Sequence, residues 1–414
     1  MNQRRRRVVI TGMGTANPLG HSVDETIAGI RAGRSGVRYM PEWDLVSDLQ
    51  GRLGGNVDGL DLRKRYPRKK RRTMGRVALL ATYASEEAVA QAGLDEALLQ
   101  SGRCGVAFGT TSGSSEAMED FCGKLFTDHT MKGLDGTSYL KFMTHTAAAN
   151  LAQYFQVRGR IIPVNSACTT SSQSIGYGFE SVAAGLQDIM LCGGAEEQHY
   201  ATAVTFDLLM ATSVRFNRDP KNSPRPFDAR RDGLVVGEGA ATVVIEALDH
   251  ALARGATPLA EVIGFGTTCD GRHMTANSRH GMRAAMQLAL ETAKVEADDI
   301  DYVCAHATAT GLGDVEESHA TYDLFQRPVP VASLKGHMGH TLAACGAIEV
   351  IACARMLQDG FLAKSANLEE VDPKCAPLGY VRELIESQPS LVMTNNFAFG
   401  GVNTSLVLRS VERA

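Results

Sequence analysis

The sequence predicts a layered α/β fold with parallel strands buried on both faces. Short apolar, β-branched runs recur along the chain, which is typical of strands covered by helices on each side. Longer stretches rich in Ala and Leu, with apolar residues at helical spacing, alternate with these runs. A weak internal repeat indicates in addition that the fold has two similar halves.

The predicted elements follow from these two patterns. The predicted strands are residues 8–12, 104–109, 161–164, 188–192, 240–246, 260–264, 302–305, 329–332 and 390–394. The predicted helices are residues 76–92, 170–184, 278–294 and 341–358. We expect the strand at 188–192 to be a buried edge strand that could pair with a second copy of the chain.

The internal repeat relates residues 161–185 to residues 329–360. Each segment reads as a strand, a tight loop and a helix of small residues that ends at a glycine, Gly185 or Gly360. Helices rich in Ala and Gly can pack closely against each other and against a sheet. We therefore expect two α/β halves, residues 1–250 and 251–414.

The composition is that of a soluble globular protein. Of 414 residues, 44% are hydrophobic and 21% charged, and 42 Lys and Arg against 46 Asp and Glu give a formal net charge of −4. No apolar run reaches the roughly 18 residues of a membrane span, so we exclude a spanning protein. The nine cysteines are scattered without a C-x-x-C pair, which favours small buried side chains in a reducing compartment over disulfides. We expect a cytoplasmic protein.

Cys168 is the strongest candidate for a reactive residue. It follows a predicted buried strand and opens a helix, in the sequence Asn165-Ser166-Ala167-Cys168-Thr169. Backbone N–H groups and the positive end of the helix dipole would lie beside its sulfur and favour the thiolate. A buried, inert thiol is the usual state of a cysteine, and we expect it for the other eight.

Two of the eleven histidines also stand where predicted strands end. His306 follows the strand at 302–305, and His340 ends the turn Lys335-Gly336-His337-Met338-Gly339-His340. Because functional groups in α/β sheets gather at the carboxyl ends of strands, we expect Cys168, His306 and His340 to converge in one cleft. Taken singly, each histidine could instead be a hydrogen-bonded structural residue.

Two other kinds of site have weaker signals. His337 and His340 are close in sequence and His306 could add a third nitrogen, but no carboxylate or cysteine stands at ligand spacing. The loop Gly12-Met13-Gly14 lacks the third glycine of a dinucleotide fingerprint, and turn glycines explain it. We expect no metal and no permanently bound cofactor.

The segment 63–76 holds nine basic residues and no acidic one. In a chain that is acidic overall, this segment should attract an anionic partner. A solvated face and a nucleic-acid site are alternatives. Trp43 is the only tryptophan and aromatic residues are few, so there is no stacking surface of the RNA-binding type.

At these residues the chain resembles the β-ketoacyl-acyl carrier protein synthases of the type I/II condensing-enzyme group, which have the thiolase fold. The resemblance covers almost the whole chain and rests on Cys168, the two histidine loops, Lys335 and Phe399-Gly400-Gly401 in the right order. Further matches are Arg225-Pro226-Phe227-Asp228, Arg231-Asp232-Gly233, Gly237-Glu238-Gly239 and His273-Met274-Thr275. The resemblance implies layered α-β-α-β-α halves with mixed five-stranded sheets, the first carrying the nucleophilic Cys and the second the two His.

The activity that the resemblance implies is a decarboxylative Claisen condensation. Cys168 would accept an acyl group from a carrier-protein thioester. His306 and His340 would donate hydrogen bonds to the thioester oxygen of malonyl as carbon dioxide leaves. The backbone N–H groups of Cys168 and Phe399 would form the oxyanion hole, and the Phe399 side chain would act as a gate.

The resemblance also implies residues for support and binding. The residues that brace the histidine loops would be Lys335, Glu349 and Asp314. The phosphopantetheine arm of the carrier, which is a substrate carrier, would contact Thr308 and Thr310. The acyl pocket would include Ser112 and Phe206, and the small Ser112 suggests room for long, unsaturated or aryl-bearing chains, as in aryl polyene-type biosynthesis. The acidic carrier protein would dock on Arg68, Lys69, Arg71 and Arg72.

Several alternatives remain open. A thiolase-like enzyme acting on coenzyme A esters would share the fold, although thiolases use a second cysteine where a histidine is expected here. Chain-length factors pair with synthases in heterodimers, but they usually lack the nucleophile that Cys168 supplies. The family is dimeric, so we expect a homodimer or a heterodimer with a related synthase subunit, and neither nucleic acid nor membrane as a partner.

Overall fold

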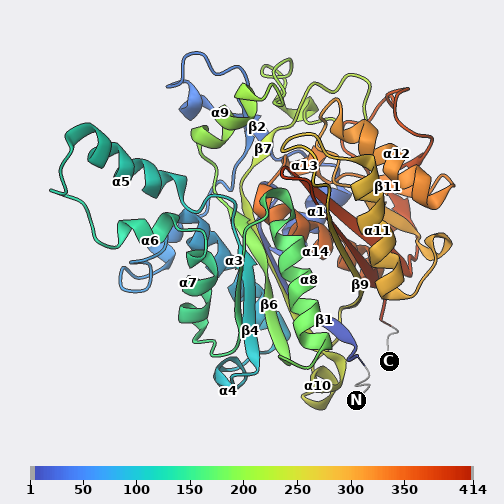
Figure 1. Ribbon diagram of the computed structural model, residues 1–414, viewed down its shortest axis with the longest axis horizontal. Coiled ribbons are helices and arrows are strands. Elements are labelled where there is room, and N and C mark those ends of the chain that lie inside the picture. The colour runs from blue at the N-terminus through green and yellow to red at the C-terminus, as the bar shows by residue number, and fades with distance from the viewer. Residues whose placement is uncertain (1–4, 412–414) are drawn as a thin grey trace.

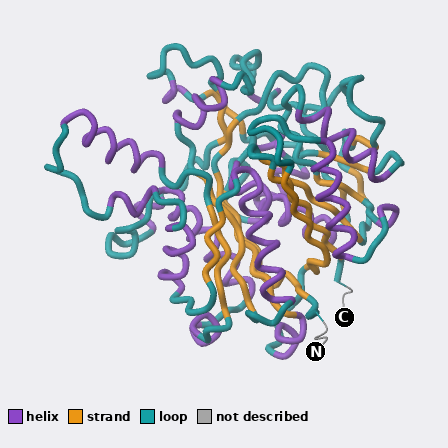
Figure 2. The backbone as a smooth tube through the Cα atoms, viewed as in Figure 1, coloured by secondary structure: helices purple, strands orange, loops and turns teal. Residues whose placement is uncertain are grey.

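The computed structural model describes residues 5–411, which fold into layers of helices around one long mixed sheet (Figures 1 and 2). Within this range the sheet has 11 strands, in the order β13-β11-β10-β15-β16-β9-β1-β8-β6-β4-β5. In chain order they are β1 (Val8–Ala16), β4 (Cys104–Gly109), β5 (Ile161–Val164), β6 (Ile189–Glu196), β8 (Gly239–Ala247), β9 (Ala260–Cys269), β10 (Tyr302–Cys304), β11 (Pro330–Ala332), β13 (Gly379–Tyr380), β15 (Leu391–Ala398) and β16 (Val402–Arg409). Shorter strands outside it are β2 (Val37–Tyr39), β3 (Leu53–Gly55), β7 (Val236–Gly237), β12 (Phe361–Leu362) and β14 (Ile385–Glu386).

The long sheet has two arms with the same internal order. Outward from the centre, the first arm runs β1-β8-β6-β4-β5 and the second runs β9-β16-β15-β10-β11. In each arm the two inner pairings are antiparallel and the two outer pairings parallel. A short antiparallel pairing of residues 8–10 with residues 260–262 joins the arms, and β13 extends the second arm. The expected mixed five-stranded sheets are thus present, joined into one ladder.

Helices cover both arms in layers (Figure 1). The outer face of the first arm packs against α3 (Arg76–Ala92) and α7 (Thr146–Phe155), and that of the second packs against α11 (Arg279–Ala293), with α12 (Gly313–Phe325) beside it. Between the arms, α8 (Thr170–Ala183) lies against α14 (Cys345–Asp359). The layers across the molecule therefore read α-β-α-β-α, as the thiolase fold requires.

The remaining helices are four to 14 residues long. They are α1 (Val23–Arg31), α2 (Leu62–Arg65), α4 (Glu96–Gln100), α5 (Ser115–Asp128), α6 (Ser138–Phe142), α9 (Tyr200–Leu208), α10 (Leu248–Ala253) and α13 (Lys335–Met338). Single 3-10 turns are η1 (Pro41–Trp43), η2 (Ala167–Thr169), η3 (Pro220–Asn222), η4 (Ala297–Asp299) and η5 (Leu342–Ala344). In residues 5–411 no helix has both the length and the apolar character needed to cross a membrane.

Glycines in the innermost strand of each arm let a helix lie close against the sheet. In β1, a Cβ atom at Gly12 or Gly14 would collide with a backbone carbonyl oxygen of α3. In β9, a Cβ atom at Gly264 or Gly266 would collide with a carbonyl oxygen of α11 in the same way. Gly12 and Gly14 therefore serve helix packing within a strand, which corrects their explanation as turn glycines.

Strand β6 lies inside the first arm, between β4 and β8. The prediction that residues 188–192 form a sheet edge is therefore wrong. The strand is buried along its whole length because it has neighbours on both sides and helices on both faces. The outer strand of this arm is β5, which pairs with β4 and whose Ile161 is 43% exposed.

Candidate active site

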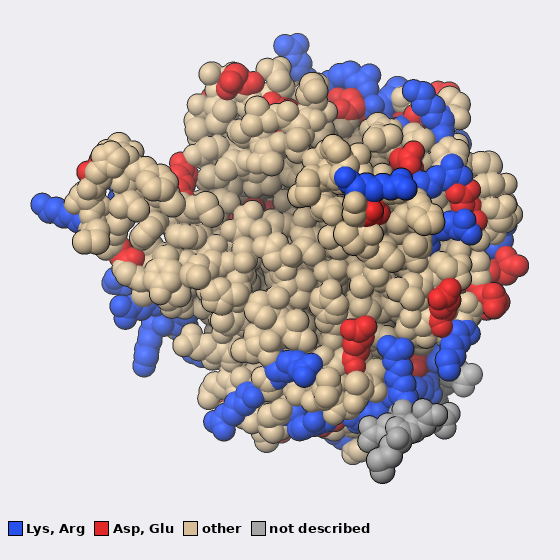
Figure 3. All heavy atoms as spheres, viewed as in Figure 1, with Lys and Arg blue, Asp and Glu red and all other residues tan. Residues whose placement is uncertain are grey.

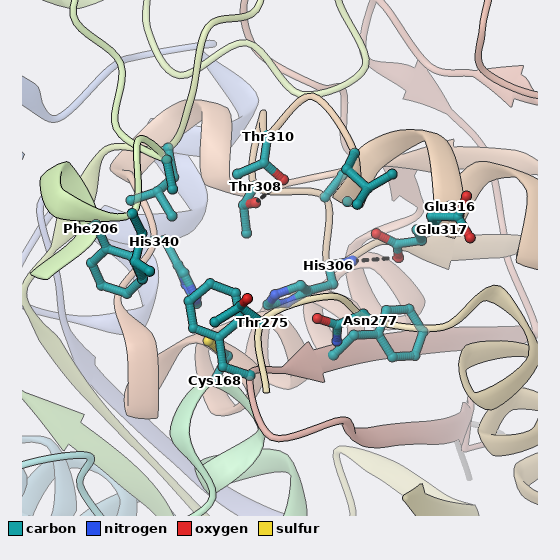
Figure 4. Close-up of a pocket in the computed structure, with 18 of the residues that line it drawn as sticks. Cys168, Phe206, Thr275, Asn277, His306, Thr308, Thr310, Glu316, Glu317 and His340 are labelled. Atoms are coloured by element: carbon teal, nitrogen blue, oxygen red, sulfur yellow. Dashed lines mark hydrogen bonds between the residues drawn. The ribbon is translucent and has the colours of Figure 1, made fainter. Parts of the chain in front are cut away.

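Three side chains that are far apart in the sequence meet near the carboxyl ends of strands. Cys168 follows β5, His306 follows β10, and His340 follows β11 after the short helix α13. Sγ of Cys168 and one ring nitrogen of each histidine lie within 4.8 Å of one another. All three line a cavity of about 210 Å³, where Figure 4 shows them facing each other. The structure thus brings together the three residues expected to converge.

Cys168 sits on a tight corner between β5 and α8. The corner consists of the single turn η2, and Ala167, directly before the cysteine, has a φ of 50°. Burial raises the pKa of the Cys168 thiol to about 12, although the charge on Lys335 and the backbone N–H groups of Cys168 and Phe399 act in the opposite direction. The effect of the backbone donors is present but smaller than the loss of hydration. The resting group is therefore the thiol, which corrects the expectation of a thiolate.

The side chains of His306 and His340 are neutral imidazoles, and each carries its ring hydrogen on Nε2. The backbone N–H of Leu342 donates to Nδ1 of His340 at 3.3 Å, and Nδ2 of Asn396 lies 3.4 Å from Nδ1 of His306. Because Nδ1 accepts in each ring, the hydrogen is on Nε2. Burial lowers the pKa of both rings well below 6.5, and the charge on Lys335 adds to this effect. Within residues 5–411, Nε2 of His340 has no partner, so it is free to donate to a ligand.

The partners of the two rings argue against a metal at this cluster. A histidine that binds a metal donates its second ring N–H to a carbonyl or a carboxylate. Here the second nitrogen of His306 and of His340 faces an N–H donor, so Nε2 offers no lone pair. The single ring of His337 points away from this cluster, with its two nitrogens 3.0 Å and 3.1 Å from the carbonyl oxygens of Arg34 and Lys364. The arrangement suits hydrogen-bond donation to an oxygen atom.

A buried ion pair lies behind the histidines. Nζ of Lys335 donates to Oε1 of Glu349 at 2.5 Å, and Oε2 of Glu349 accepts from Nδ2 of Asn396 at 2.7 Å. Burial opposes the charge on Lys335, but the nearby Glu349 carboxylate outweighs it and raises the pKa of the lysine above its usual value. Because Asn396 also contacts His306, the pair helps to fix that ring.

Two buried carboxyl groups support the loop after β10. Glu317 accepts a hydrogen bond from the backbone N–H of His306 at 2.7 Å, and burial raises its pKa to about 8. Asp314 accepts from a backbone N–H at 2.8 Å, and burial raises its pKa to about 6. Sequence reasoning found Asp314 but missed Glu317 and Asn396. The pair of asparagines in the otherwise apolar strand β15 was a usable signal for Asn396, whereas Glu317 next to Glu316 looked like a solvated charge.

Four of the other predicted site residues line the cavity, and Ser112 does not. Its lining includes Thr308, Thr310, Phe206 and Phe399. The Oγ1 atoms of the two threonines lie 3.2 Å apart, and the rings of the two phenylalanines lie 6.1 Å apart between centroids. Ser112 is exposed beyond the end of β4 and is not part of this lining, so its place in an acyl pocket stays a prediction.

The basic segment lies away from the cavity, next to the projecting helices α5 and α6. Figure 3 shows Lys and Arg side chains gathered below this projection. Arg65 forms an ion pair with Glu86, and Arg76 forms an ion pair with Glu238. Within residues 5–411, none of the four predicted docking residues forms an ion pair or lines the cavity: Arg68, Lys69, Arg71 and Arg72.

Comparisons with known proteins agree with this site. Residues 5–251 match the family model described as the β-ketoacyl synthase N-terminal domain, and residues 259–369 match its C-terminal domain. The 3-oxoacyl-[acyl-carrier-protein] synthase 1 of Haemophilus influenzae is 36% identical, over 98% of this chain and 99% of its own.

Solved structures agree over the same length. A β-ketoacyl synthase from Burkholderia phymatum is 49% identical, with a TM-score of 0.95, over 98% of this chain and 100% of that chain. The ishigamide ketosynthase/chain length factor is 32% identical, with a TM-score of 0.90, over 99% of this chain and 100% of that chain. Since the matches span both arms of the sheet and the whole cavity, the chain belongs to the β-ketoacyl synthase family, as an acyltransferase of the β-ketoacyl-acyl carrier protein synthase type.

Proposed function

We propose that Cys168 is the nucleophile that carries the growing acyl chain. Its sulfur attacks the carbonyl carbon of an acyl-carrier thioester, the new C–S bond forms, and the carrier thiol leaves with the proton that the cysteine loses. The oxyanion of this step would lie against the backbone N–H groups of Cys168 and Phe399. Their orientation toward Sγ supports this role. A donor in such a position lowers a barrier by about 3 kcal/mol.

In the second half-reaction, we propose that His306 and His340 stabilise the enolate of malonyl. The bond to the malonyl carboxylate breaks, carbon dioxide leaves, and the electron pair moves toward the thioester oxygen between the two Nε2–H donors. The enolate carbon then attacks the acyl carbonyl on Cys168, the C–S bond breaks, and the departing cysteine thiolate takes up a proton from solvent. The observation that carries this proposal is the approach of one sulfur and two imidazoles to within 4.8 Å.

The neutral state of the rings matters for this chemistry. An imidazolium could protonate the enolate carbon and end the reaction before the carbon–carbon bond forms. A neutral Nε2–H stabilises the developing negative charge without giving up its proton. Burial and the charge on Lys335 keep His306 and His340 neutral. We propose that Lys335, with Glu349, acts through this field and through the position of the rings.

The finer assignments are proposals of the same kind. Thr308 and Thr310 would hold the phosphopantetheine arm, Phe399 would gate the cavity, and residues 1–250 and 251–414 would be the two functional halves. The acidic carrier would contact the basic segment. A homodimer, paired through β5, is favoured by the free side of that strand, and a heterodimer is favoured by the likeness to a ketosynthase/chain length factor. The location would be the cytoplasm, in fatty acid or polyketide biosynthesis that extends to aryl polyene-type chains.

Intact-mass analysis tests the nucleophile. Incubation with a panel of acyl-carriers should add one acyl group to the wild-type chain and none to Cys168→Ala. An adduct that persists on the variant would refute the assignment. Release of carbon dioxide from malonyl-carrier separates this reading from a thiolase-like enzyme of coenzyme A esters. Retention on immobilised carrier protein, but not on DNA at equal salt, separates it from nucleic-acid binding.

A further inference from the structure

Cys345 is a second buried thiol beside the nucleophile, and the proposed mechanism gives it no role. It is the first residue of α14, directly after the corner η5, and it is 3% exposed. Its Sγ donates a hydrogen bond to the backbone carbonyl oxygen of Cys168 at 3.3 Å. Burial raises the pKa of this thiol well above 9, so the sulfur keeps the hydrogen that it donates. The corner that carries Cys168 is therefore held by a side chain from the other half of the chain.

Asn396, in β15, contacts the same sulfur. Its Nδ2 donates to Oε2 of Glu349 at 2.7 Å, and it lies 3.5 Å from Sγ of Cys345 and 3.4 Å from Nδ1 of His306. Because a carboxylate oxygen can only accept, Glu349 fixes the nitrogen side of the amide toward itself. The first amide hydrogen goes to Glu349, and the second is shared between the sulfur and the ring nitrogen. One amide hydrogen thus reaches both the thiol that holds the nucleophile's corner and the ring of His306.

The start of α14 leaves room for this amide. A Cβ atom at Gly346 would lie 2.5 Å from Oδ1 of Asn396 and 2.9 Å from Cβ of Ser172 in α8. Glycine at this position therefore admits the amide and lets α14 lie close to α8. Within residues 5–411, Oδ1 of Asn396 has no hydrogen-bond partner, which is costly for a buried oxygen. The amide is thus placed for its two hydrogens and not for its oxygen.

The corner that carries Cys168 depends on such support because its backbone is strained. Ala167 has a φ of 50°, and a residue with a Cβ keeps this conformation only where its surroundings fix it. Oγ1 of Thr170 donates to the carbonyl oxygen of Ala167 at 2.7 Å, and Cys345 donates to that of Cys168. These two bonds hold the peptide groups directly before and directly after the α-carbon of Cys168. They therefore orient both its side chain and its backbone N–H.

We infer that Cys345 and Asn396 are positioning residues for the condensation, which form one hydrogen-bonded chain from Glu349 to the corner of Cys168 with a branch to His306. This inference rests on the proposed function. The nucleophile and the ring belong to different halves of the chain, and the two positioning residues would keep them at a fixed separation. Neither side chain is part of the cavity lining, so both act through the reacting residues and not on the substrate.

Single-turnover acylation of Cys168 tests the role of Cys345. The variants are Cys345→Ala, which removes the hydrogen bonds, and Cys345→Ser, whose hydroxyl can donate and accept in the same way. Cys353→Ala is the control, because Cys353 is also buried on α14, about two turns further along. Each protein is mixed with octanoyl-acyl carrier protein over a range of concentrations, and intact mass follows the added octanoyl group with time.

We expect Cys345→Ala to lower the maximal rate of acylation about fivefold, the effect of losing a weak hydrogen bond. Cys345→Ser should stay within about twofold of wild type, and Cys353→Ala should equal it. The half-saturating concentration of octanoyl-acyl carrier protein should not change in any of the three. A loss of rate without a loss of affinity, recovered by a hydroxyl, is not expected of a residue that only fills space.

A double variant tests whether the two residues act together. Asn396 does not contact Cys168, yet Asn396→Ala should also slow acylation, and adding Cys345→Ala to it should slow acylation little further. Release of carbon dioxide from malonyl-acyl carrier protein should fall in Asn396→Ala and stay near the wild-type rate in Cys345→Ala, because Asn396 is the one that contacts His306. Thermal unfolding of each variant shows which of them are folded.

Acylation of Cys345→Ala at the rate of Cys353→Ala would overturn the inference. Equal slowing in Cys345→Ala and Cys345→Ser would also overturn it, since the hydrogen bonds would then not be the cause. Additive effects of Cys345→Ala and Asn396→Ala would show that the two residues do not form one chain. The comparison of the cysteine variants decides the matter even where Asn396→Ala does not fold. A wild-type chain that takes up no octanoyl group would instead refute the proposed function.

Discussion

The backbone N–H of Leu342 donates a hydrogen bond to Nδ1 of His340 and thereby determines which ring nitrogen carries the proton. Leu342 lies in the turn η5 with a φ of 48°. This tight corner points its N–H back at the ring, which leaves Nε2–H directed at the cavity. The local backbone, and not a neighbouring carboxylate, sets the tautomer of His340.

His340→Ala should abolish this donor and slow decarboxylation of malonyl-carrier by about 10²–10³-fold, the usual effect of losing one donor to a developing oxyanion. Acylation of Cys168 should continue, because it depends on the backbone donors at Cys168 and Phe399. His340→Asn should retain part of the rate, since its amide can donate. Release of carbon dioxide and intact mass measure the two steps separately. If decarboxylation by His340→Ala proceeds at the wild-type rate, the ring is not the donor.

The buried rings should make folding stability depend on pH below neutrality. The pKa of His306 and of His340 in the folded chain is well below the 6.5 of the exposed ring. The unfolded chain therefore binds more protons, and stability is fully present above pH 6.5 and falls as the pH drops below it. The loss is at most about 1.4 kcal/mol per pH unit for each histidine. Urea unfolding at several pH values should show a shallower slope in His306→Asn/His340→Asn than in wild type, and equal slopes would contradict the assignment.

The ion pair of Lys335 and Glu349 should be costly to break on one side. Lys335→Met leaves a buried carboxylate without its partner, and the free energy of unfolding should fall by about 3–5 kcal/mol. The double variant Lys335→Met/Glu349→Gln removes both charges and keeps an acceptor for Asn396, so much of this loss should be recovered. Urea unfolding of the two variants and of Glu349→Gln gives the coupling energy. A double variant no more stable than Lys335→Met would show that the unpaired charge is not the cause.

The thiol of Cys168 should be slow to alkylate at neutral pH. With its pKa raised to about 12, the reactive thiolate fraction grows about tenfold for each pH unit throughout the accessible range. Rates of iodoacetamide labelling, measured on the Cys168 peptide between pH 7 and pH 9, should rise without a plateau. Cys168→Ser provides the background. A plateau in this range would mean that Lys335 and the backbone donors outweigh burial.

The sequence predicted the regular parts of the fold closely. The predicted strands 104–109 and 161–164 and the predicted helix 76–92 coincide with β4, β5 and α3. The strand β16 was missed because Asn403, Thr404 and Ser405 interrupt its apolar pattern, yet all three are fully buried. Residues 402–409 form a strand because of their tertiary packing, and their sequence pattern alone does not indicate it. The edge position of a strand was not readable either, since burial on both faces looks the same in every parallel strand.

The sequence likewise predicted some features of the site and not others. Strand ends and turns identified Cys168, His306 and His340, because their position depends on local chain geometry. The state of the thiol depends on burial that only the packed structure supplies. Glu317 has no sequence signal of its own, and Asn396 has only the pair of asparagines in β15, so the contacts of these two residues with His306 could not be inferred from spacing.

The two corners η2 and η5 occupy equivalent places after β5 and β11, and they lie in contact. One corner presents Cys168, and at the same step of the other stands Ala343, which has no reactive group. Under the proposed function, the two copies would have different roles: the earlier copy would carry the acyl group on Cys168, and the later copy would supply the two imidazole rings. Cutting the gene between these copies would give two fragments, neither of which holds a complete set of reacting groups, so only their reassembly could restore turnover.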